Sequence, residues 1–113
     1  MRTKKIREKD IQHKVVSYAK QRGFRPFKRT TLGPYGTTGD PDYEFNGLGR
    51  HTFFIEFKAP GKTSTPKQVQ AQEELQALGY HVYECDNVAD GEAIIDAELE
   101  EQRSAAQRSC EGL

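Results

Sequence analysis

The sequence places an acid and a base two residues apart in its most apolar segment, at Glu56 and Lys58. In an extended strand, such residues share one face and lie about 6.5–7 Å apart. A carboxylate there can bind a hard cation, and a lysine can hold or activate a water molecule. The triplet alone is a weak indication, because a chain of this composition contains about one Glu-x-Lys by chance. An ordinary surface ion pair on a strand is the alternative.

The surroundings of the pair favour a chemical role. Its neighbours are the apolar side chains Phe53, Phe54, Ile55 and Phe57. Such a strand is typically central and buried, and a buried charge needs a partner or a metal.

Two further acids can reach this strand. Asp42 ends Gly39-Asp40-Pro41-Asp42, just before the turn that leads to Glu56. An antiparallel neighbour brings Asp42 close to Glu56, where two carboxylates repel unless a cation lies between them. A plain turn is the alternative, since all these residues favour turns. Glu8 lies three residues before Ile11, beside the core-facing stripe of the first helix. A solvated glutamate is the alternative there.

Apolar spacing and turn residues predict the elements that position these side chains. A helix over 5–22 has Ile11, Val15 and Tyr18 inward and ends at Gly23. A short strand is plausible within 24–38, where Phe24 and Phe27 can pack and Arg25, Lys28 and Arg29 point outward. A loop follows over 33–41.

Asn46-Gly47-Leu48-Gly49 joins strands over 42–45 and 51–58 into an antiparallel hairpin. A helix over 65–78 then begins with Thr65 as its cap and Pro66 in its first turn. Its inner side is Val69, Gln72, Leu75 and Leu78 or Gly79, and Gly79 ends it.

A strand over 81–85 should lie parallel to 51–58 with a right-handed crossover. Asp86-Asn87 can cap a third helix with Val88, Ile95 and Leu99 inward. Fraying is expected after about Arg103, within a terminal tail over 104–113. The predicted order is α-β-β-β-α-β-α, a mixed central sheet flanked by helices.

Composition indicates one domain over residues 1–113, with its core at about 6–103. The zero net charge hides an asymmetry: residues 1–30 carry eleven Lys and Arg against two acids, and residues 84–113 carry nine acids against two Arg. A basic segment suits a phosphate backbone, although a solvated helix face is equally compatible. No membrane span, secretory signal or nucleotide-binding loop is found. Cys85 and Cys110 lack a disulfide framework, which favours a reducing, cytoplasmic setting in a bacterial or phage-infected cell.

In chain order, the motifs resemble those of the VRR-NUC family of PD-(D/E)XK nucleases, in its stand-alone phage and bacterial form. They are Glu8-Lys9-Asp10-Ile11-Gln12, Gly39-Asp40-Pro41-Asp42, Phe54-Ile55-Glu56-Phe57-Lys58-Ala59-Pro60-Gly61 and Thr65-Pro66-Lys67-Gln68. The resemblance covers about residues 6–87 and implies a restriction-endonuclease-like α/β core. Asp40 and Glu44 depart from the family pattern, which leaves open which acid accompanies Glu56.

The resemblance implies a Mg²⁺- or Mn²⁺-dependent DNA endonuclease. Asp42, Glu56 and the backbone carbonyl of Phe57 would bind the metal. Lys58 would orient the attacking water, and Glu8 would hold a metal-bound water or a second metal.

Gln68 would steady Lys58 unless the helix cap uses its side chain. DNA contacts are expected from Lys5, Lys9, Lys62 and Lys67. Branched DNA such as a four-way (Holliday) junction is the expected substrate, and a homodimer the expected assembly. Nuclease action on flaps, ends or linear DNA is an alternative. A catalytically silent nucleic-acid-binding module and a plain interaction domain are others. His13, His51 and His81 lack zinc-site spacing and are expected to be structural or exposed.

Overall fold

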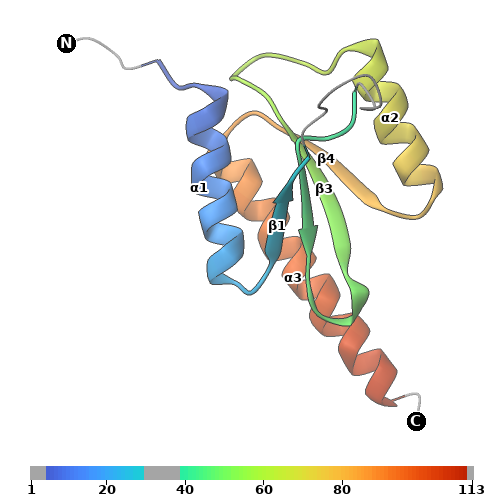
Figure 1. Cartoon of the computed structure of the whole chain (residues 1–113). Helices are drawn as coiled ribbons and strands as arrows, with labels where there is room; N and C mark the ends of the chain where they lie inside the picture. The colour runs from blue at the N-terminus through green and yellow to red at the C-terminus, as the bar shows by residue number, and fades with distance from the viewer. Residues whose placement is uncertain (1–4, 30–38, 112–113) are drawn as a thin grey trace.

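A mixed sheet with helices on both faces forms the protein, as the computed structural model shows for residues 5–29 and 39–111 (Figure 1). The predicted order of elements is confirmed. Within these residues the elements are α1 (Glu8–Gln21), β1 (Arg25–Lys28), β2 (Tyr43–Asn46), a 3-10 turn (Leu48–Arg50), β3 (Thr52–Phe57), α2 (Pro66–Ala77), β4 (His81–Cys85) and α3 (Val88–Glu111).

The strands lie in the order β1-β2-β3-β4. β1 pairs antiparallel with β2, and β2 pairs antiparallel with β3, with Tyr43 opposite Ile55. β4 runs parallel to β3, as the intervening helix predicted, with Glu56 beside Glu84. The hairpin between β2 and β3 is confirmed; its connection runs over 47–51, one residue later than predicted, and contains the 3-10 turn.

Alternation along β3 separates the apolar core from the polar face. Phe53, Ile55 and Phe57 are buried in one cluster with the inner face of α1 and with Ile95 of α3. Phe54 and Glu56 project to the opposite face, where α2 lies. The sheet therefore has an apolar face under α1 and α3, and a face under α2 that carries the charged and polar side chains near Glu56.

Close packing of α1 against α3 requires a glycine at position 91. A Cβ atom on Gly91 would overlap the Val15 side chain and lie 3.2 Å from the Cys85 sulfur. The missing side chain lets the two helices approach over one sheet face.

A buried carboxylate joins three elements at one edge of this core. Glu98 of α3 is only 1% exposed. His81 Nδ1 lies 2.8 Å from its oxygens, His51 Nε2 lies 3.2 Å away, and the Tyr83 hydroxyl donates at 3.2 Å. Burial, followed by the Glu98 charge, raises the pKa of Tyr83 to about 12, so the hydroxyl remains a donor. His51 and His81 are therefore structural, as expected, and His13 is exposed.

The predicted inner face of the second helix is wrong in part. Leu78 is 75% exposed and Val69 is exposed as well, whereas Ala71 is buried. The polar site beneath α2 explains the difference, because Gln68, rather than an apolar residue, faces β3. Phe27, expected to pack, is 46% exposed because its short strand lies at the sheet edge.

Element ends differ in several places. The first helix begins at Glu8 rather than at residue 5, since the Asp10 carboxylate accepts the Arg7 N–H at 3.2 Å and fixes the first turn. Regular structure was expected to end at about Arg103, but α3 continues to Glu111. Residues 33–38 of the predicted loop lie outside the described residues. No helix in the described part of the chain is long and apolar enough to cross a membrane.

We expect Glu98→Ala to lower the free energy of unfolding by about 2–4 kcal/mol, because it leaves three polar partners around an emptied buried position. Urea unfolding followed by circular dichroism measures this change. Glu101→Ala is the matched control, since Glu101 is exposed on the same helix. An equal, small effect of both substitutions would contradict a stabilising role for the cluster.

Candidate active site

Two carboxylates face each other where β2 begins and β3 ends. The register that sets Tyr43 opposite Ile55 places Asp42 across from Glu56. Asp42 Oδ2 accepts the Phe57 backbone N–H at 2.9 Å. Glu56 is 2% exposed, and its Oε2 atom has no hydrogen-bond partner among the described residues. A buried carboxylate oxygen without a donor is costly unless the carboxyl is protonated or a cation meets it.

The surroundings disfavour negative charge on both acids. Burial is the main cause that raises the pKa of Glu56, and the Asp42 charge raises it further, to about 7. The Lys58 ammonium and a hydrogen bond from the Asp42 backbone act in the opposite direction, and Glu8 adds a smaller increase. Burial also raises the pKa of Asp42, against the Phe57 N–H and the charges of Lys58 and Lys28. A cation between the two acids would relieve this penalty.

Gln68 connects the acid to the base. Its Oε1 accepts from Lys58 Nζ at 2.6 Å and from the Thr65 backbone N–H at 2.8 Å. Its Nε2 donates to Glu56 Oε1 at 2.8 Å. Because both groups at Oε1 are donors, the amide orientation is determined by its neighbours. The two interpretations of Gln68 therefore hold together: it completes the cap of α2 and also steadies Lys58.

Lys58 lies largely buried beside this amide. Its ammonium is 3.6 Å from Glu56 Oε1. The predicted triplet is therefore a partly buried ion pair instead of a surface pair on a strand.

The segment before Asp42 packs tightly on the start of α2. Gly39 has φ +95°, and a Cβ atom there would lie 2.7 Å from the Lys67 backbone oxygen. Pro41 is fully buried. Glycine at 39 therefore lets the chain approach the helix before it turns into β2.

The other predicted acids have different surroundings. Glu8 is half-buried in the first turn of α1, where Gln12 donates to it at 3.0 Å. Its influence on the pKa of Glu56 places it near the site. Asp40 and Glu44 both accept from Arg29, at 3.3 and 3.1 Å. Asp42 is therefore the acid that accompanies Glu56.

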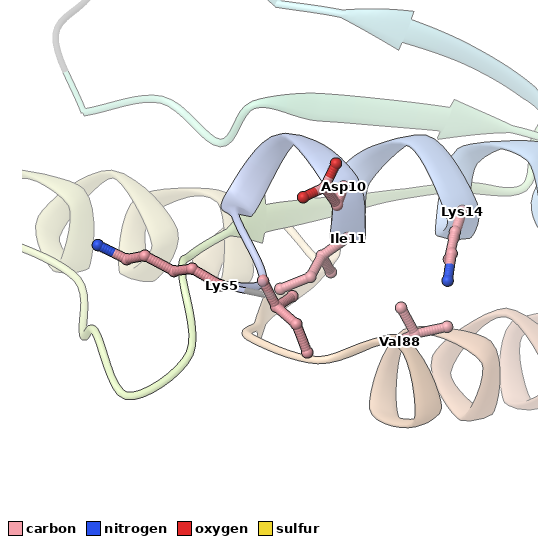
Figure 2. A pocket seen from close by; sticks show the side chains of 6 residues that line it. Lys5, Asp10, Ile11, Lys14 and Val88 are labelled. Carbon is pink, nitrogen blue, oxygen red and sulfur yellow. The ribbon is translucent and has the colours of Figure 1, made fainter. Parts of the chain in front are cut away.

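The lysines predicted to contact DNA are exposed but come from separate segments. Lys67 is in the first turn of α2, and Lys62 is in the loop before it. Figure 2 shows Lys5 extending away from α1 beside a hollow of about 230 Å³, lined by Lys5, Ile6, Asp10, Ile11, Lys14 and Val88. Neither Asp42 nor Glu56 lines that hollow.

Sequence reasoning missed Lys28 and Arg29 as neighbours of the site. It placed both outward near a short strand, and Lys28 ends β1 while Arg29 directly follows it. Only the pairing of β1 with β2 brings them beside Asp42.

The donor set suits a cation that keeps part of its water. Within residues 5–29 and 39–111, no group of three or more His, Cys, Asp and Glu side chains forms a metal cluster. Mg²⁺ commonly binds through one or two carboxylates and retains several waters. Asp42 and the unpartnered Glu56 oxygen fit this requirement.

Comparisons with known proteins agree with the fold. A solved structure described as a VRR_NUC domain superposes with a TM-score of 0.67 at 19% sequence identity, covering 79% of this chain and 94% of that chain. No protein-family model matches the sequence, and no curated protein matches it either. The resemblance drawn from the motifs is confirmed for the fold, as is the predicted mixed α/β architecture.

We expect the stability of the wild-type protein in EDTA to fall, relative to Glu56→Gln, as pH rises through the range between 4.5 and about 7. A pKa raised in the folded state means that folding favours the protonated carboxyl, so its contribution is present at low pH and lost on ionisation. The difference should change by about 2–3 kcal/mol between the two ends of this range. Denaturant unfolding at a series of pH values measures it. Parallel pH profiles of the two proteins would show that Glu56 ionises normally.

Proposed function

We propose that this chain, which has the fold of a VRR_NUC domain, is a nuclease that hydrolyses DNA phosphodiester bonds with Mg²⁺ or Mn²⁺. The observation that carries the proposal is the buried, unpartnered Oε2 atom of Glu56 beside Asp42. The fold match supports it, because the matched structure is described as a nuclease domain by name. The order and spacing of the site motifs give further support.

Asp42, Glu56 and the backbone carbonyl of Phe57 would hold the cation. When bound, it would polarise the scissile phosphate and lower the pKa of water. Glu8 would contribute through water or at a second cation, in keeping with its electrostatic effect on Glu56.

Lys58 would orient the attacking water and offset negative charge that develops on the phosphate. Its ammonium is restrained by Gln68 at 2.6 Å and by Glu56 at 3.6 Å, so it needs little reorganisation. Gln68 would maintain this arrangement because the helix cap fixes its amide. The backbone of the DNA would meet the exposed lysines Lys5, Lys9, Lys62 and Lys67.

A four-way junction is the proposed preferred substrate, cut by a homodimer. One site cuts one strand, so two chains are needed for paired nicks. The uneven charge supports this assembly, since the basic first third of one chain can face the acidic last third of another.

We expect metal-dependent cleavage of a labelled four-way junction, with rates at least about 100-fold lower for Asp42→Asn and for Lys58→Ala. Flap and linear duplex substrates, each with Mg²⁺, Mn²⁺ or EDTA, establish the preference. Glu84→Gln is the matched control, because Glu84 lies beside Glu56 in the sheet but is exposed. It should cut within about twofold of wild type.

Two results would contradict the nuclease proposal. Tight DNA binding without cutting under any metal would indicate a silent binding module. Absence of DNA binding, with folding intact by circular dichroism, would indicate an interaction domain.

We expect light scattering to give about twice the mass of one chain, with partial dissociation at high salt because opposite charges across the contact are screened. A monomer at concentrations that support junction cleavage would exclude the paired-nick arrangement, but would leave the chemistry of the single site intact.

A further inference from the structure

We propose that Arg29 is a positioning residue that neutralises Asp40 and Glu44, the two acids flanking Asp42. It thereby leaves Asp42 and Glu56 as the acids that bind the cation, and the cation in turn binds the phosphate. The inference rests on the proposed nuclease function and deepens it. It assigns to Arg29 a role that acts through Asp40 and Glu44 rather than through contact with the reacting atoms.

Arg29 is tied to Asp42 through the backbone. Its N–H donates to the Asp42 carbonyl at 2.7 Å, one step beyond the pairing of Lys28 with Tyr43. This bond extends the β1–β2 ladder to Asp42, so the position of Arg29 and that of Asp42 are determined together.

The guanidinium joins the acids on either side of Asp42 in sequence. One terminal nitrogen donates to Glu44 Oε1 at 3.1 Å and the other to Asp40 Oδ2 at 3.3 Å. The guanidinium carbon also lies 5.5 Å from the Phe54 ring centroid, which restrains the group over the sheet. A planar fork can serve two carboxylates at once, whereas a lysine ammonium cannot reproduce that geometry.

The ion pairs of Arg29 matter because Asp40 and Glu44 carry negative charge close to Asp42. Asp40 and Glu44 are two residues from Asp42 on either side, and both carboxylates are partly exposed. Without Arg29 they would add two negative charges beside the place where a phosphate must enter, and would offer rival oxygen ligands to a cation. Sequence departures from the family pattern at Asp40 and Glu44 are thus compensated by a residue from the neighbouring strand.

If Arg29 acts by neutralising charge, removing the charges of Asp40 and Glu44 should rescue the Arg29→Ala variant. If Arg29 only supports the structure, it should not. Arg29→Ala should raise the KM for junction DNA at least about tenfold, with a smaller effect on kcat. Adding Asp40→Asn and Glu44→Gln to Arg29→Ala should restore KM to within about threefold of wild type, because the unmasked charges are gone. That triple variant does not restore the lost hydrogen bonds, so its stability should stay below that of wild type. Recovery of stability without recovery of KM would overturn the proposal.

Binding of Mn²⁺, followed by electron paramagnetic resonance, supplies a readout that does not depend on cleavage. In the Glu56→Gln protein, Mn²⁺ binding should be lost. In Glu56→Gln with Arg29→Ala, weak binding should return at Asp40 and Glu44, and it should disappear again when both are neutralised. If Arg29→Ala leaves binding unchanged in that background, the masking role is wrong.

Arg22→Ala is the matched control. Arg22 also stacks on an aromatic ring, that of Tyr18, and pairs with an acid, Asp96, but does so between α1 and α3. It should leave both KM and Mn²⁺ binding unchanged. If wild type binds Mn²⁺ at Glu56 but cuts no DNA, the nuclease proposal fails while the binding experiment still decides the role of Arg29.

Discussion

Two carboxylates are held together across β2 and β3 at a place where burial disfavours charge on either of them. Glu56 is on the most deeply buried strand, and Asp42 enters from the neighbouring one. Lys58 and the backbone N–H groups of Asp42 and Phe57 offset only part of this cost, so the pKa of Glu56 stays raised, to about 7, and that of Asp42 stays raised as well. The Oε2 atom of Glu56 has no hydrogen-bond partner among the described residues, so its charged form is costly unless the carboxyl is protonated or a cation binds there.

The side chain of Gln68 both caps α2 and contacts the two charged residues of the candidate site. Helix α2 needs a partner for its first backbone donors, and the Thr65–Gln68 capping box supplies it. The amide that completes the cap also touches Lys58 and Glu56. Formation of the helix start therefore sets the position of the base, so that a residue typical of helix capping becomes part of the candidate active site.

Stability and chemistry are divided between the two faces of the sheet. Under α1 and α3 the core is apolar, and Glu98 closes its edge through contacts to His51, His81 and Tyr83. Under α2 the site contacts are polar, and apolar side chains such as Val69 of that helix and Leu78 at its end remain exposed. The free energy of packing on one face can therefore offset the cost of burying charged groups on the other.

Local pattern in the sequence determined the order of the elements and the alternation along β3, but not which side chains of α2 and β1 are buried. Alternation placed Glu56 and Lys58 on one face, and the capping residues located the start of α2, because such features depend on neighbours a few residues away. Tertiary structure alone decided that Arg29 donates hydrogen bonds to Asp40 and Glu44. It also decided that Gln68 contacts Glu56 while it completes the cap of α2. These contacts depend on strand register and helix placement between segments remote in sequence, which no local periodicity specifies.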